Sequence, residues 1–149
     1  MVFLIPHARR LGLRLLGKEG DNLMIEMPFN PELEVTAGSG IIANGAITAF
    51  LDTALGAAAY DQFETYKKIV TLDLRVDYFE KPEAFSSVIV KTRCLKITEQ
   101  AVFVQGDAFS KDAITPIAHA VAVFSYEAMT TSVDDTLKSL DGISSGDAG

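Results

Sequence analysis

Residues 43–60 read ANGAITAFLDTALGAAAY, which predicts one long and largely apolar helix. Asp52 stands near its middle, where aspartate is a poor helix former and an ionised carboxylate in apolar surroundings is costly. Asn44, Thr48 and Asp52 follow at intervals of four residues, so they share one face of the helix. The pattern leaves two interpretations open. The face either lets another helix approach closely, or it forms a pocket floor with one reactive carboxylate.

The start of this helix offers a second reactive feature. A glycine-containing loop, GSGIIANGA at residues 38–46, leads into it, and unpaired N–H groups at a helix start favour an oxyanion. Asn44 is the expected N-cap, although Ser39 or a later residue could also serve. Asn44 lies eight residues before Asp52, about 12 Å along a helix. A base and an oxyanion donor must each lie about 3 Å from one reacting centre. A catalytic site that uses both therefore requires a dimer.

Strand patterns surround the helix. The clearest is VTLDLRVDYF at residues 70–79. Its alternation predicts two faces: Val70, Leu72, Leu74, Val76 and Tyr78 on one, and Thr71, Asp73, Arg75 and Asp77 on the other. Two short strands are expected within residues 12–29, and three more at 87–97, 101–110 and 117–126, as in an antiparallel meander. The order predicts an α+β fold, in which an antiparallel sheet of about five to six strands wraps around one long central helix.

Length, charge and cysteine content limit the class of protein. The 149 residues suit one domain, expected at 1–126, followed by an acidic, Ser/Gly-rich tail at 127–149 that we expect to be largely disordered. The net charge of -7 argues against nucleic-acid binding, and Asp52 and its polar neighbours argue against a membrane span. Cys94, the one cysteine, excludes an intramolecular disulfide and suits the cytoplasm. With two histidines, no metal-site spacing is present.

Three segments resemble a known family. IIANGAITAFLDTALGAAA at 41–59, VTLDLRVDYFEKP at 70–82 and AHAVAVFSY at 118–126 are similar to hotdog-fold thioesterases of the phenylacetate-pathway, or PaaI-like, branch. The likeness extends from about Ile5 to Tyr126. It implies a helix wrapped by an antiparallel sheet, and homodimers whose sheets join edge to edge. It also implies active sites at the dimer interface, with dimers that often pair into homotetramers.

The resemblance also assigns roles at the site. Members carry a His-Gly-Gly turn at the helix start and an acidic residue further along. Asp52 matches the acid, which acts as general base or nucleophile. The backbone N–H groups of Asn44 and Gly45 match the oxyanion donors, and Thr71 matches a hydroxyl that positions the attacking water. The sequence departs from the family at the turn, because Ala43 replaces the histidine and Asn44 replaces the first glycine.

The expected substrate is an acyl-CoA thioester with an aryl or medium-chain acyl group. The segment 78–82 matches the stretch that lines the coenzyme A groove, so Tyr78, Lys81 and the stripe residue Thr48 are expected to bind substrate, with Lys81 meeting a phosphate. No metal or redox cofactor is expected, because thioester hydrolysis needs none and the sequence has no cluster of metal ligands. Coenzyme A enters only as part of the substrate. One alternative is a degenerate hotdog protein that binds acyl-CoA or another apolar ligand without turnover. Another is a hydratase or dehydratase, but His7 and His119 carry no recognisable motif for it.

Overall fold

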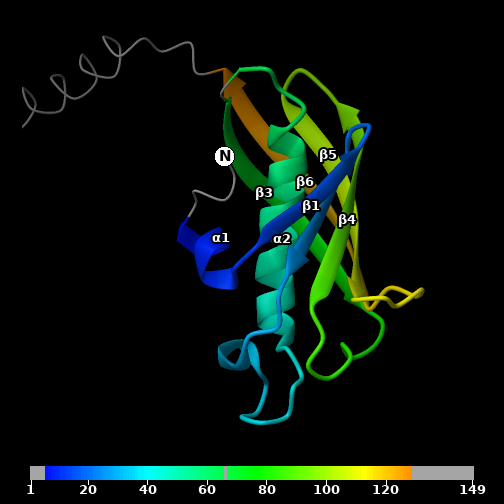
Figure 1. Ribbon diagram of the computed structural model, residues 1–149. Helices are drawn as coiled ribbons and strands as arrows, with labels where there is room; N and C mark the ends of the chain where they lie inside the picture. The colour runs from blue at the N-terminus through cyan, green and yellow to red at the C-terminus, as the bar shows by residue number, and fades with distance from the viewer. Residues whose placement is uncertain (1–5, 66, 129–149) are drawn as a thin grey trace, which may run out of the picture.

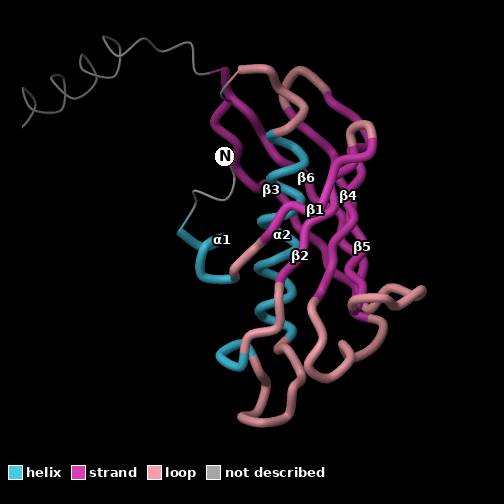
Figure 2. Tube along the Cα trace, viewed as in Figure 1, coloured by secondary structure: helices cyan, strands magenta, loops and turns pink. Residues whose placement is uncertain are grey.

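The computed structural model of the chain describes residues 6–65 and 67–128, which form one sheet and two α-helices (Figures 1 and 2). The elements in chain order are α1 (Pro6–Leu11), β1 (Arg14–Glu19), β2 (Asn22–Met27), a short 3-10 helix (Pro31–Leu33), α2 (Asn44–Tyr60), β3 (Lys67–Tyr78), β4 (Val88–Ile97), β5 (Ala101–Ser110) and β6 (Ala118–Ala128). The predicted long helix and all the predicted strands are therefore present. The predicted tail begins at residue 127, but residues 127 and 128 belong to β6, where they pair with Lys68 and Lys67 of β3. The rest of the predicted tail lies outside the described residues.

The six strands form one antiparallel sheet in the order β1-β2-β4-β5-β6-β3. Strands β4, β5 and β6 are the predicted meander, whereas β3 pairs with β6 and occupies one edge of the sheet. The sheet curves around α2, which runs along its inner face (Figure 1). This arrangement confirms the predicted α+β architecture of a sheet wrapped on one central helix.

Close approach between α2 and the sheet depends on small residues. Phe50, Leu51 and Leu55 of α2 are completely buried against the strands. Opposite them, Gly106 of β5 leaves room that no larger residue would, since a Cβ at this position would lie 2.8 Å from Cδ2 of Leu55. The apolar side of the predicted helix thus forms the core, and the polar stripe is left on the other side.

A β-bulge in β3 overturns the strict alternation that the sequence predicts. Thr71 pairs with Phe124 and Asp73 with Val123, so Leu72 is the extra residue. The bulge turns Thr71 towards α2, while the exposed fraction of Leu72 is 62%. Val70, predicted to share the apolar face with Leu74, is also exposed. An apolar/polar pattern cannot reveal an inserted residue that resets the period.

The far end of α2 is fixed to the β1–β2 hairpin. Lys18 Nζ lies 2.7 Å from Oδ2 of Asp61, which is the C-cap of α2.

Between residues 6 and 128, leaving out residue 66, no helix combines the length and the apolar character that a bilayer span requires.

Candidate functional site

The first turn of α2 is capped by backbone groups alone. Ala43 is the N-cap, in an extended conformation and with no side-chain hydrogen bond, so the prediction of Asn44 as N-cap is wrong. The Ala43 N–H donates to the carbonyl of Leu33 at 2.8 Å, and the Ala43 carbonyl accepts from the N–H groups of Ala46 and Ile47. These backbone hydrogen bonds fix the segment that leads into the helix, so no capping side chain is needed. Asn44 is the first helical residue.

The next two N–H groups are left available. Those of Asn44 and Gly45 donate to no other group in the described part of the chain, as expected at a helix start. Both residues are exposed, and apart from the adjacent residues and the backbone of the helix itself, no atom lies within 4 Å of the place where a Cβ on Gly45 would be. The helix therefore presents two adjacent donors, with its positive dipole end, to open space.

Three of the predicted site residues meet in one hydrogen-bond network. The carbonyl of Asn44 accepts from Tyr78 Oη at 2.9 Å and from Thr48 Oγ1 at 3.0 Å. The Thr48 and Tyr78 hydroxyls also lie within hydrogen-bond distance of each other, and since each hydroxyl carries one proton, two of these three bonds form at a time. Tyr78 is the last residue of β3, so the network fixes the end of this edge strand to the first turn of α2.

Asp52 lies two turns further along the same face of α2. It is half-buried, and its Oδ1 accepts a hydrogen bond from Thr71 Oγ1 at 3.2 Å. No Lys or Arg among residues 6–65 and 67–128 forms an ion pair with it. A carboxylate with one hydroxyl donor and no cation beside it keeps lone pairs free to accept a proton. The predicted Asp52–Thr71 pair is thus brought together, about 12 Å along the helix from Asn44.

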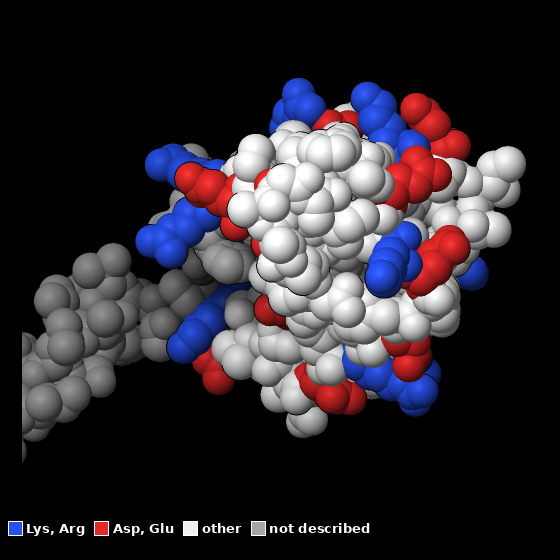
Figure 3. Space-filling view, turned by 90° about the horizontal axis from the view of Figure 1, so that it is seen from below, with Lys and Arg blue, Asp and Glu red and all other residues white. Residues whose placement is uncertain are grey.

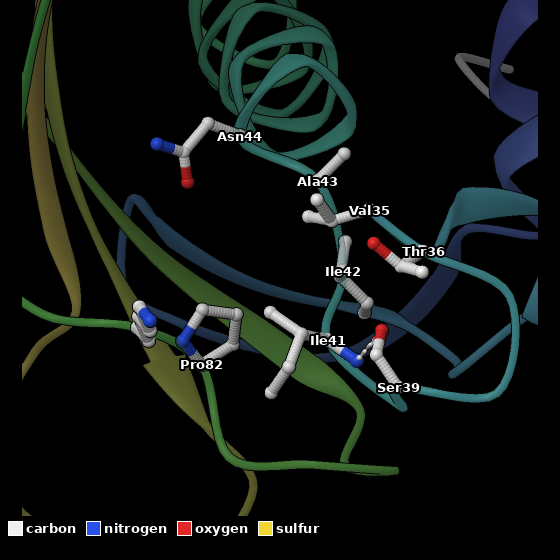
Figure 4. Close-up of a pocket in the computed structure, with 9 residues that line it drawn as sticks. Val35, Thr36, Ser39, Ile41, Ile42, Ala43, Asn44 and Pro82 are labelled. Carbon is white, nitrogen blue, oxygen red and sulfur yellow. Dashed lines mark hydrogen bonds between the residues drawn. The ribbon is translucent and has the colours of Figure 1, made fainter.

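A cavity of about 500 Å³ lies in front of the helix start (Figure 4). Its lining residues come from two loops and the first residue of α2: Val35, Thr36, Ser39, Ile41, Ile42, Ala43, Asn44, Lys81 and Pro82. Figure 4 shows Ile41 and Pro82 beside each other, with Asn44 across the open space. The lining includes Asn44 and Lys81 from the predicted set, but neither Asp52 nor Thr71. The sequence predicted a glycine-containing loop at residues 38–46 that leads into the helix, but it did not predict a cavity there.

The two loops that line the cavity carry little positive charge. Lys81 is the one basic residue in segments 28–43 and 79–87. Figure 3, which views the molecule from this end, shows a largely uncharged middle with charged side chains towards the rim. Exposed apolar side chains on these segments include those of Val35, Phe79 and Phe85. No group of three potential metal ligands occurs in the described ranges.

The polar stripe of α2 runs beside the edge strand. Strand β3 pairs only with β6 in the part of the chain that the structure describes, so its other edge has no strand partner. The exposed fractions of Val70 and Leu72 on this strand are 48% and 62%. A long edge strand with apolar side chains is a surface on which another strand can pair.

A model of the thioesterase superfamily matches residues 39–117, more than half of the chain. The chain belongs to the thioesterase superfamily. The matched region contains α2, β3 and the cavity-lining residues from Ser39 to Pro82, so the expectation of a thioesterase-type enzyme is confirmed at the level of the superfamily. No protein with a curated description matches the chain.

Several solved structures share the fold. A protein from Pseudomonas aeruginosa is 30% identical, with a TM-score of 0.74 over 82% of this chain and 90% of that chain. A thioesterase from Haemophilus influenzae is 14% identical, with a TM-score of 0.77 over 89% and 90%. A mutant of the phenylacetic acid degradation protein PaaI from Thermus thermophilus is 18% identical, with a TM-score of 0.67 over 80% and 97%. The resemblance to hotdog thioesterases, and with it the hotdog fold, is confirmed.

Proposed function

We propose that this member of the thioesterase superfamily is a cytoplasmic acyl-CoA thioesterase that hydrolyses an aryl- or medium-chain acyl-CoA at a site made by two copies of the chain. The observation that carries the proposal is the placement of Asp52. It lies half-buried on the exposed stripe of α2, next to an edge strand, with Thr71 as its hydrogen-bond donor. A carboxylate held in this way suits a general base or a nucleophile.

As general base, Asp52 would take a proton from a water that Thr71 helps to position. The water oxygen attacks the thioester carbonyl carbon, and the carbonyl oxygen becomes an oxyanion. The free N–H groups of Asn44 and Gly45 supply two donors for this charge. The C–S bond then breaks, and the coenzyme A thiolate leaves and takes up a proton. As nucleophile, the Asp52 carboxylate would instead attack the carbonyl carbon and displace the coenzyme A thiolate, which takes up a proton. Water would then hydrolyse the mixed anhydride to the free acid and restore the carboxylate.

The separation along α2 is the reason for a dimer. Asp52 and the N–H groups at Asn44 lie about 12 Å apart in one chain, too far to act on one carbonyl. Two antiparallel copies of α2 would place Asp52 of one copy opposite the helix start of the other. The free edge of β3, which runs beside the stripe, supports such pairing. Dimers of this kind could pair further into tetramers.

The cavity supports the proposed class of substrate. Its walls are mostly apolar, which suits an aromatic ring or a medium alkyl chain. Lys81 supplies one cation at its lining, where it could meet a phosphate of coenzyme A. The Tyr78 and Thr48 hydroxyls at the helix start would contact the substrate near the thioester. In this proposal coenzyme A is part of the substrate and the reaction needs no metal.

Thiol release from a panel of aryl- and alkyl-acyl-CoAs tests the proposal. Wild type, Asp52→Asn and Asp21→Asn would be compared, the last as a control because Asp21 is an exposed aspartate in the β1–β2 turn. We expect turnover by wild type and by the control, with kcat of Asp52→Asn lower by about 100-fold or more. Equal rates for all three proteins would exclude the assigned role of Asp52.

Ala43 favours the second candidate function, an acyl-CoA-binding hotdog protein without turnover. It occupies the place where the resemblance implies a histidine, and its side chain offers no donor for the thioester. Saturable binding of acyl-CoA by calorimetry, with no thiol release from any panel member, would support this function instead.

A further inference from the structure

We propose that Phe85 is a positioning residue for the substrate cavity, and that its contact with Gly40 sets the distance between the two cavity loops. The inference rests on the proposed function. Gly40 follows Ser39 and precedes Ile41, two lining residues, and Phe85 lies three residues after the lining residue Pro82. Neither partner of the contact lines the cavity itself.

The contact combines a hydrogen bond with ring packing. The N–H of Phe85 donates to the carbonyl of Gly40 at 2.9 Å. The ring of Phe85 lies against the Cα of Gly40, since a Cβ there would lie 2.7 Å from ring atoms Cδ2 and Cε2. The ring also contacts Phe29 edge-on, with centroids 5.4 Å apart. These contacts hold the ring in place although the exposed fraction of Phe85 is 64%.

The backbone conformation of Phe85 indicates that the contact is needed. Its φ of 58° lies in the left-handed region, which a bulky aromatic residue rarely adopts. Such a conformation persists where surrounding contacts determine it. Gly40 has a φ of 73°, and its N–H donates to a carboxylate oxygen of Glu34. The backbone hydrogen bond between the two loops therefore joins two residues of positive φ.

The position of this contact gives it a role in substrate binding. Between segments 34–43 and 79–87 of the described chain, no other backbone hydrogen bond joins the two loops. At the other end of the cavity, Tyr78 is bonded to the carbonyl of Asn44. The Phe85–Gly40 contact and the Tyr78–Asn44 bond thus bracket the cavity. Loss of the first would let the segment that leads into Asn44 and Gly45 move away from Lys81 and Pro82.

Phe85→Gly removes the ring, and glycine accepts the φ of 58° without strain although it also frees the backbone. Phe85→Tyr keeps the ring, and Ile114→Ala removes an apolar side chain that is 93% exposed on the loop between β5 and β6. Hydrogen exchange should become at least tenfold faster within residues 34–45 of Phe85→Gly and stay unchanged in the two controls. Unchanged exchange in Phe85→Gly would overturn the proposal.

Kinetics with the best acyl-CoA of the panel tests the link to substrate. For Phe85→Gly we expect a KM about tenfold higher with a smaller change in kcat, and wild-type values for Phe85→Tyr and Ile114→Ala. Faster exchange with unchanged kinetics would refute a role in positioning substrate. If wild type itself turns over no acyl-CoA, the proposed function fails, and the exchange data alone decide whether Phe85 holds the loop.

A double-mutant cycle separates direct contact from a general loss of stability. Gly40→Ala places a methyl group where the ring lies, so it should disturb the loop strongly in wild type. In the Phe85→Gly background the clash with the ring is gone and only the strain of an alanine at a φ of 73° remains, so Gly40→Ala should accelerate exchange by a smaller factor. Equal factors in both backgrounds would show that the two residues act independently, which contradicts the proposal.

Discussion

Thr71 Oγ1 donates a hydrogen bond to Asp52 Oδ1 at 3.2 Å, and the bulge at Leu72 is what turns this threonine towards the helix. The bond orients one carboxylate oxygen and leaves the other available. In the proposed mechanism, the same hydroxyl also lies where it can position the attacking water.

Thr71→Val should therefore lower kcat by about 10- to 100-fold, because a hydrogen bond to a charged group contributes about 1.5–3 kcal/mol. Valine keeps the shape of threonine and its preference for strands, so the free energy of unfolding should change little. Steady-state kinetics on the best acyl-CoA provides the measurement. Thr71→Ser, which retains a hydroxyl, serves as control, and equal loss in both variants would argue against the role of the hydroxyl.

The Thr71 position also shows how far the sequence could predict this molecule. The helix, the strands and the α+β class follow from local periodicity, which reports burial residue by residue. The pairing of β3 with β6 depends on contacts between distant segments, and the bulge depends on the register of that pairing. The alternation of apolar and polar residues at 70–79 reveals neither the strand pairing nor the bulge. The predicted faces of Val70 and Thr71 were therefore wrong.

The candidate site, like the fold, was predicted from the sequence only in part. Asn44, Thr48 and Asp52 were placed on one helix face from spacing alone, and the structure agrees. The N-cap was missed because backbone groups replace a capping side chain at Ala43. Phe85 was missed because no pattern in the sequence marks an aromatic residue with a positive φ.

The shared carbonyl of Asn44 leads to a prediction on stability. Tyr78→Phe removes one of two hydroxyl donors to this carbonyl, so we expect a loss of about 0.5–1.5 kcal/mol in the free energy of unfolding. Thr48→Val should cost a similar amount. Because the hydroxyls also bond to each other, the double variant should depart from additivity by at least about 0.5 kcal/mol. Urea denaturation of the four proteins gives the values, and strict additivity would mean that the network is not shared.

Cys94 should react slowly with thiol reagents. Burial raises the pKa of its thiol above the usual 9.0, which outweighs the lowering by a backbone hydrogen bond at Lys96. The neutral thiol is therefore favoured at neutral pH, and the thiolate is the reactive form. Labelling at pH 7.5 should be at least tenfold slower in the native protein than in urea. Equal rates in the native protein and in urea would contradict the burial of this side chain. The variant Cys94→Ser lacks a thiol and would serve as the blank in thiol-release assays.

Gly106→Ala should destabilise the fold at the contact of α2 with β5. The added Cβ would lie 2.8 Å from Cδ2 of Leu55 and 3.4 Å from Cγ1 of Val90. Overpacking of this kind costs about 1–3 kcal/mol, which calorimetry would detect as a lower Tm. Gly17→Ala in β1 is the matched control, because no atom lies within 4 Å of its added Cβ. A Tm for Gly106→Ala at or above that of Gly17→Ala would show that the helix can move away from the sheet at no cost.

The free edge of β3 gives the most direct test of a site shared by two chains. Leu72→Lys places a charge on the edge strand where we propose that a second copy pairs, and edge lysines oppose strand pairing. Leu95→Lys is the matched control, since Leu95 is also an exposed bulge residue but lies in β4, which two strands separate from β3 and its free edge. In analytical ultracentrifugation, wild type and Leu95→Lys should sediment as dimers or tetramers. Leu72→Lys should shift towards the monomer and lose thiol release in parallel, because Asp52 of one chain then lacks the N–H groups of the other. A fully active monomer would refute the shared site, whatever the role of Asp52.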